Sequence, residues 1–125
     1  METETTFCLI KPESYIFRKT GYIKNALNDS GLRIINHSQI RLSFCDIFGL
    51  YPEWLPRVTM SLRFYPLFDV DLFYLEGENS IERMHRLKRN IRKELGGFIF
   101  GGYIHAPDNT AEFNRARQIF SKRMV

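Results

Sequence analysis

Cysteine is scarce in this sequence. The sequence also shows neither a signal peptide nor a long apolar run. The 2 cysteines, Cys8 and Cys45, lie in segments typical of an apolar strand and of the start of a helix. With no signal peptide ahead of them, both are interpreted as reduced thiols of a cytoplasmic protein. Because no apolar run approaches the roughly 18 residues of a membrane-spanning helix, the sequence predicts a soluble protein without a membrane partner.

The sequence also has no large excess of positive or negative charge. Lys and Arg total 18 against 14 Asp and Glu, which gives a formal net charge of +4. A small basic excess of this kind suits an anionic ligand such as a nucleotide and does not demand nucleic acid. The 125 residues, of which 44% are hydrophobic, are enough for one packed core. We therefore predict a single domain over residues 1–125.

The first part of the chain has the pattern of two strands and two helices. An apolar run that Pro12 stops indicates a buried strand followed by a loop. Helical spacing that ends at Gly31 indicates a helix, and an Ile-rich strand with polar interruptions follows it. Ser43 is placed to cap the next helix. The predicted elements are a strand at 6–11, a helix at 20–30, a strand at 32–42 and a helix from 43 to about 50.

Proline is concentrated in one segment, because three of the 5 prolines lie within residues 51–66. That segment is predicted to be irregular or a broken helix. The remainder repeats the earlier order, with a strand at 69–75, a charged helix to about 95, a strand at 98–104 and a last helix to about 120. Asn79 or Ser80 is expected to cap the charged helix, and Asn109 or Thr110 the last one. The apolar stripe of the charged helix is formed by Ile81, Met84, Leu87 and Ile91. Two strand–helix–strand halves predict an α+β fold, a ferredoxin-like sandwich of four mostly antiparallel strands with helices on one face.

Only 3 histidines are present. His37 falls in a predicted strand and His85 in the charged helix, so both are interpreted as surface or hydrogen-bonded side chains. His105 follows two glycine pairs and precedes an Ala-Pro-Asp turn. A side chain at a strand end is exposed and firmly held, which suits a nucleophile. A purely structural role for His105 stays open on position alone.

Cationic side chains occur at two further places. Lys11 ends an apolar strand directly before a proline, where it is either the polar end of a buried strand or a point charge for a phosphate. The predicted charged helix carries a dense basic run that is either a solvated face or a funnel for anions. That run consists of Arg83, Arg86, Lys88, Arg89, Arg92 and Lys93.

Taken in order along the chain, these motifs resemble the nucleoside diphosphate kinase family. The family's first strand ends in a lysine, a proline and an acidic residue, which correspond to Lys11, Pro12 and Glu13. Its N-x-x-H-G-S-D motif corresponds to residues 102–108, with the histidine at His105. Its Ile-Arg pair, thirteen residues before the histidine, falls on Arg92 and the isoleucine before it. The resemblance covers roughly residues 4–46 and 68–120.

The resemblance implies a ping-pong phosphotransferase. His105 would take the γ-phosphate of a nucleoside triphosphate and pass it to a nucleoside diphosphate, with Mg²⁺ bridging the phosphates. It further implies that Lys11 and Arg92 bind phosphate, with Tyr51 as a weaker third contact. The family's helix arginine falls on His85 in direct register, so Arg86 takes that role only with a slip of one residue.

Several family positions are replaced. The asparagine expected to bond the nucleotide sugar is Gly102, and the serine after the histidine is Pro107, which has no N–H. The glutamate that orients the histidine falls on Arg115 or Ala116, so Glu112, about one turn earlier, is its nearby substitute. A deletion between Arg86 and Arg92 shortens the loop of the family's trimer contacts. We therefore expect a homo-oligomer smaller than a hexamer, namely a dimer.

Three hypotheses for function remain. The first is an active phosphotransferase that uses His105, and the second is a catalytically weakened nucleotide-binding module with a regulatory or scaffold role. The third is a ferredoxin-like RNA-binding domain, suggested by the basic pI and the aromatic Phe98, Phe100 and Tyr103. These aromatics lack the Lys/Arg-Gly-Phe spacing of an RNA-binding strand, and Phe98 and Phe100 alternate as core residues do. Nucleic acid is therefore not an expected partner.

Overall fold

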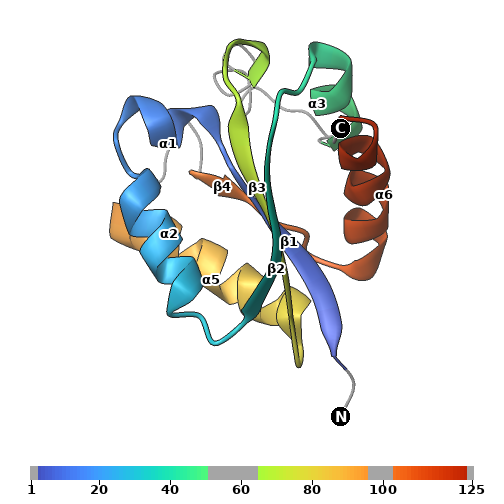
Figure 1. Cartoon of the computed structure of the whole chain (residues 1–125). Helices are drawn as coiled ribbons and strands as arrows, with labels where there is room; N and C mark the ends of the chain where they lie inside the picture. Colours follow the sequence, from blue (N-terminus) through green and yellow to red (C-terminus); the bar gives the residue numbers. More distant parts are fainter. Residues whose placement is uncertain (1–2, 51–64, 96–102, 124–125) are drawn as a thin grey trace.

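A single antiparallel sheet organises the computed structural model, which describes residues 3–50, 65–95 and 103–123. Its four strands lie in the order β2-β3-β1-β4. This confirms the predicted α+β class with a four-stranded antiparallel sheet (Figure 1). In chain order the elements are β1 (Glu4–Ile10), α1 (Pro12–Ile16), α2 (Thr20–Asn28), β2 (Arg33–Ile40), α3 (Phe44–Leu50), the 3₁₀ helix η2 (Tyr65–Leu67), β3 (Val70–Gly77), α5 (Ser80–Leu95), β4 (Ile104–His105) and α6 (Thr110–Ser121).

Strand β1 is the central element, paired with β3 on one side and β4 on the other. Its residues from Phe7 to Ile10 are fully buried. Successive side chains of a strand point to opposite faces. Phe7 and Leu9 accordingly belong to one hydrophobic cluster, and Cys8 and Ile10 belong to another. The sheet therefore has a core on each face.

The prediction that the helices lie on one face was wrong. Helices α2 and α5 cover one face, whereas α3 and α6 cover the other (Figure 1). The physical reason lies in the sequence of β1, a continuous apolar run rather than an alternation of apolar and polar residues. Such a run marks a strand that is buried on both sides.

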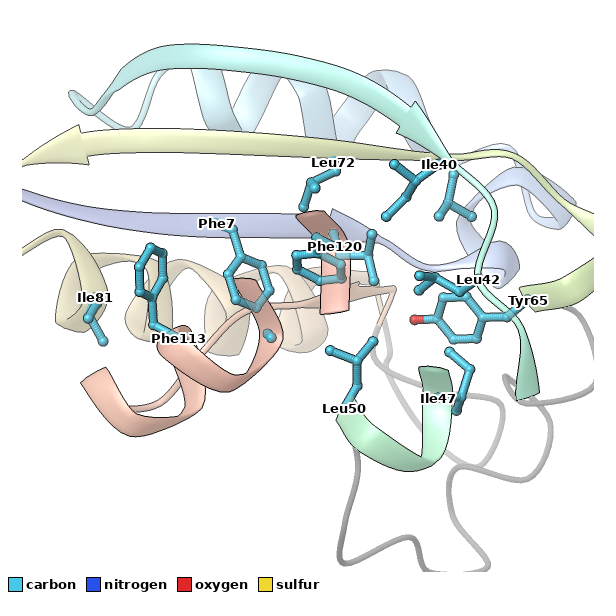
Figure 2. Close-up of a cluster of buried hydrophobic side chains, with 13 residues drawn as sticks. Phe7, Ile40, Leu42, Ile47, Leu50, Tyr65, Leu72, Ile81, Phe113 and Phe120 are labelled. Atoms are coloured by element: carbon cyan, nitrogen blue, oxygen red, sulfur yellow. The ribbon is translucent and has the colours of Figure 1, made fainter. Parts of the chain in front are cut away.

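The cluster under α3 and α6 is built around aromatic rings (Figure 2). The ring of Phe7 packs edge-on against Phe120 with centroids 4.9 Å apart, and Phe113 lies 6.1 Å from Phe7. The cluster on the opposite face joins Cys8 and Ile10 to apolar side chains of α2 and α5. Both cysteines are free thiols, and burial raises the pKa of Cys8 to about 12.

Helix starts follow the predicted caps. The backbone N–H of Asp46 donates to Ser43 Oγ, and the N–H of Ser43 donates to the Asp46 carboxylate, which together form a capping box. Asn109 Oδ1 accepts from the N–H of Glu112 at 2.9 Å. Both caps were expected from the sequence, because serine and asparagine side chains satisfy the N–H groups of a first helical turn.

The segment after β1 is a helix where a loop was predicted. Helix α1 begins directly after Lys11, with Pro12 at its first position. Proline stops a strand but is well suited to start a helix, because its fixed φ matches helical geometry and its missing N–H is not needed there. The helix is followed by Arg18 with φ of 59°, a left-handed conformation that turns the chain into α2.

Several predictions fall partly or wholly outside the described residues. Of the segment at 51–66, the structure describes only 65 and 66, which belong to η2. Of the predicted strand at 98–104, the structure describes Tyr103 and Ile104, and β4 comprises Ile104–His105. Tyr51 also lies outside the described residues. Within the described ranges, no helix is long and apolar enough to cross a membrane.

Replacing Phe120 tests whether α6 closes a true second core. We expect Phe120→Ala to lower the free energy of unfolding by about 3–5 kcal/mol in urea denaturation, because it removes a fully buried ring beside Phe7. Leu67→Ala is the control, since Leu67 is 68% exposed, and it should change stability by less than about 0.5 kcal/mol. Equal effects of the two variants would contradict the two-core description.

Candidate functional site

The ends of β1 and β4 bring Lys11 and His105 together. His105 pairs directly with Leu9, so the two side chains lie on the same face of the sheet. Lys11 follows two residues after Leu9 in extended backbone, which directs its side chain to that face as well. The backbone N–H of Lys11 donates to the Tyr103 carbonyl at 3.0 Å. The sheet itself therefore fixes the spacing between this lysine and this histidine.

Lys11 is a buried cation. It is 3% exposed, and its Nζ lies 3.7 Å from the carboxylate of Glu13. Burial, aided by the positive charges of Arg92 and Lys88, lowers the pKa of Lys11 to about 8, and Glu13 opposes this shift. An anion bound nearby would stabilise the charged form of this ammonium group, because a buried charge is stabilised by each opposite charge placed near it.

Helix α5 supplies two more cations to the same place. Lys88 and Arg92 are four residues apart and therefore lie on one face of the helix. Arg92 Nη2 donates to the Ile104 carbonyl at 3.4 Å. Lys88 Nζ donates to the Ala106 carbonyl at 3.0 Å. We call Lys11, Lys88 and Arg92 the cation cluster.

His105 is partly buried beside the cation cluster, and its ring lies 5.7 Å from the ring of Phe7. Burial and the positive charges of Lys11, Lys88 and Arg92 lower the pKa of His105 well below its ordinary value, against the opposing effect of Asp108. The imidazole is therefore neutral at physiological pH. A neutral imidazole has a nitrogen lone pair available for nucleophilic attack.

Asp108 supplies a negative charge that acts on His105. Its Oδ1 accepts from Lys88 Nζ at 2.7 Å and lies 2.7 Å from His85 Nδ1. Burial raises the pKa of Asp108, but the hydrogen bonds and charges of Lys88 and His85 outweigh burial and lower it. The carboxylate is thus ionised and holds α5 to the turn that follows His105.

Of the residues predicted from the sequence, the structure brings His105, Lys11 and Arg92 together. Arg86 points elsewhere, since its guanidinium donates to Glu82 at 2.8 Å and is mostly exposed. His85, the residue in direct register, is the one that reaches the turn after His105. The roles of all these residues remain predictions.

Glu112, predicted as a substitute for the orienting glutamate, belongs to the cap of α6. Its carboxylate accepts from the N–H of Asp108 at 3.4 Å and from Asn109 Nδ2 at 3.2 Å. Both contacts are with the turn that follows His105 rather than with the imidazole. Glu112 therefore fixes the backbone behind the histidine, and a direct orienting role stays a prediction.

Lys88 was missed by the sequence analysis, although a signal for it exists. It was named only as one of the basic run, for which a solvated face and an anion funnel both stayed open. It lies four residues after Met84 and three before Ile91, which are both buried. A lysine at that spacing within an apolar stripe faces the protein interior. The partners that make its burial tolerable, Ala106 and Asp108, come from a distant segment and could not be read from the helix alone.

The described residues contain no group of three or more His, Cys, Asp and Glu side chains that could hold a metal ion. The cation cluster is suited to anions. Three positive side chains with one neutral nucleophile and one carboxylate form a site that can bind a phosphate group and accept it.

No family model matches the chain. Among curated proteins, it is similar to the nucleoside diphosphate kinase of Novosphingobium aromaticivorans, with 28% identity over an alignment of 131 positions that covers 95% of this chain and 92% of that protein. It is also 32% identical over 83 residues to the nucleoside diphosphate kinase of Phenylobacterium zucineum, in a match that covers 65% of this chain and spans 60% of that relative's length.

Solved structures show the same fold. The nucleoside diphosphate kinase of Encephalitozoon cuniculi superposes with a TM-score of 0.79 at 16% identity, covering 94% of this chain and 88% of that one. The Halobacterium salinarum enzyme in complex with CDP gives 0.78 at 21% identity, covering 95% and 88%. The Borrelia burgdorferi enzyme with vanadate and ADP gives 0.73 at 18% identity, covering 98% and 90%.

Sequence and fold point in the same direction. Similarity in sequence extends over nearly the whole chain, and the fold agrees over the same length. The chain is a distant relative of nucleoside diphosphate kinases in sequence, and it shares their fold.

Proposed function

We propose that this protein is a phosphotransferase that moves the γ-phosphate of a nucleoside triphosphate to a nucleoside diphosphate through His105. The observation that carries the proposal is the neutral imidazole of His105 beside the cation cluster. A nitrogen nucleophile for phosphoryl transfer must be unprotonated, and the transferred group needs positive charge around its oxygens. The lowered pKa of His105 and the cations at the joined ends of β1 and β4 support both conditions.

In the first half-reaction, one imidazole nitrogen of His105 attacks the γ-phosphorus. A nitrogen–phosphorus bond forms while the bond from phosphorus to the β,γ-bridging oxygen breaks, and the nucleoside diphosphate leaves with that oxygen. In the second half-reaction, a terminal oxygen of another diphosphate attacks the phosphohistidine, and the imidazole leaves as a neutral group. Lys11 and Arg92 stabilise the negative charge on the transferred group in both directions.

Nucleoside phosphates are the proposed ligands of Lys11 and Arg92, two members of the cation cluster. Solved relatives of this fold hold ADP with vanadate in one case and CDP in another. Mg²⁺, when bound through the nucleotide phosphates, would neutralise the charge that develops between the β- and γ-phosphates. A homo-oligomer, with a dimer as the expected state, and a cytoplasmic location stay predictions from the sequence.

A catalytically weakened nucleotide-binding module is the second candidate. It is favoured by Glu112, whose carboxylate is engaged in the cap of α6. It is also favoured by Gly102 and Pro107, which replace the family's asparagine and serine. In this role Lys11 and Arg92 would bind the nucleotide phosphates, and His105 would not transfer a phosphate group.

Covalent labelling separates the two candidates. We expect incubation with γ-labelled ATP and Mg²⁺ to give an acid-labile, base-stable label that His105→Ala abolishes, because phosphohistidine carries the label. His37→Ala is the matched control and should label at the wild-type rate, since His37 is bound to Asp71 and stacks on Phe73 away from β4. Nucleotide binding without any label would refute the first candidate and support the second.

The labelling rate at low ATP should depend on pH in a way that identifies Lys11. As the pH falls through about 6.5, the rate should hold, because the lowered pKa keeps His105 neutral. As the pH rises through about 8, the rate should fall, because Lys11 loses its proton there. Lys11→Arg should remove the decline on the alkaline side, since arginine stays charged. An alkaline decline that persists unchanged in Lys11→Arg would show that another group is responsible.

A further inference from the structure

Backbone carbonyl groups on both sides of His105 accept hydrogen bonds from other parts of the chain. Before the histidine, the Tyr103 carbonyl accepts from Ser14 Oγ at 2.6 Å as well as from the Lys11 N–H. The next carbonyl, of Ile104, accepts from the guanidinium of Arg92. After the histidine, the Ala106 carbonyl accepts from Lys88 Nζ at 3.0 Å. Side chains from two helices therefore hold both sides of this residue.

The segment after His105 receives little support from the sheet. Strand β4 comprises only Ile104–His105, so ladder pairing ends at the histidine itself. Pro107 has no N–H and cannot donate a hydrogen bond. Lys88 holds this segment at two points, because the same Nζ that bonds the Ala106 carbonyl lies 2.7 Å from Asp108 Oδ1. A single ammonium group thus spans the turn.

Lys88 is buried to a degree that is unusual for lysine. It is 6% exposed and stands in the apolar stripe of α5 between Met84 and Ile91. Burying an ammonium group is costly unless hydrogen-bond acceptors and an opposite charge compensate it. Here both compensating groups lie on the segment that follows His105, so the burial of Lys88 and the conformation of that segment depend on each other.

Lys88 and Lys11 differ in what their ammonium groups contact. Two acceptors on the protein already occupy Lys88 Nζ, whereas the main charge partner of Lys11 is Glu13 at the longer distance of 3.7 Å. The charged groups that face His105 are Lys11 from the end of β1, Lys88 and Arg92 from α5, and Asp108 from the turn after β4. Lys88 is the member of this set that contacts the turn directly.

We propose that Lys88 is a positioning residue for His105: its ammonium group clamps the turn at residues 106–108 and thereby fixes the imidazole for phosphoryl transfer. The proposal rests on the proposed function and extends it to a residue to which the resemblance assigns no role. The clamp supplies, from α5, an anchor for a turn in which proline stands two residues after the histidine.

The test compares Lys88→Met with Lys93→Met, which removes a lysine from the exposed side of the same helix. In Lys88→Met, we expect labelling by saturating γ-labelled ATP to slow at least about tenfold, because a small displacement of a nucleophile strongly reduces reactivity. The dissociation constant for ATP should change by less than about threefold, since the phosphate contacts assigned to Lys11 and Arg92 remain. Lys93→Met should leave both within about twofold.

A second variant, Asp108→Asn, distinguishes a clamp from a simple effect of charge. Loss of the Lys88 charge should move the titration of His105, followed by NMR of its ring protons, to higher pH. Loss of the Asp108 charge should move it to lower pH, which favours the neutral nucleophile. The clamp nevertheless predicts slower labelling in both variants, whereas a purely electrostatic role predicts no slowing in Asp108→Asn.

The NMR titration uses the protein without nucleotide. It therefore tests the positioning role of Lys88 even if the wild-type protein takes up no label. If the wild type takes up no phosphate, the proposed function is refuted. The clamp then still predicts altered ring signals of His105 and altered amide signals of residues 106 and 108 in Lys88→Met, with Lys93→Met unchanged. Labelling at the wild-type rate in Lys88→Met, or ring and amide signals that match the wild type, would overturn the proposal.

Discussion

Burial of β1 on both faces is the constraint on which the rest of the structure depends. The strand ends at Ile10, directly before the buried Lys11 and the proline that begins α1. Because β4 pairs with the last two residues of β1, the same constraint sets the position of His105. Helix α5, which packs on one of these faces, then delivers Lys88 and Arg92 to the same end of the strand.

The cation cluster shifts the protonation of the groups at the end of β1 and β4. Burial and mutual repulsion lower the pKa of Lys11, and the same charges make protonation of His105 unfavourable. Sites with strongly shifted pKa values are frequently functional, because the shift matches a group to its chemical task. A bound phosphate would relieve the repulsion, since its negative charge opposes the positive charges of the cluster.

Much of the fold could be predicted because local signals and tertiary packing agree. The caps at Ser43 and Asn109 and the apolar spacing of α5 depend on neighbours in sequence, and these predictions are confirmed. Helix α1 was missed because proline signals both the end of a strand and the start of a helix. The second helical layer was missed because the apolar run of β1 was not interpreted as burial on both faces.

In the candidate site, only the residues that belong to a recognisable motif could be predicted from the sequence. Lys11, Arg92 and His105 were found through a resemblance in residue type and spacing, and the structure places them together. Lys88 has no such motif. Its importance comes from hydrogen bonds to a segment about twenty residues later in the chain, and contacts of this kind depend on how α5 and β4 pack together.

Discharge of the labelled protein tests the central claim most directly. Protein first labelled with γ-labelled ATP and Mg²⁺, then freed of nucleotide, is mixed with unlabelled GDP, and the product is followed by chromatography. A phosphohistidine intermediate at His105 predicts that the label leaves the protein and appears in GTP in equal amount. Label that stays on the protein, or that leaves only as inorganic phosphate, would contradict the account.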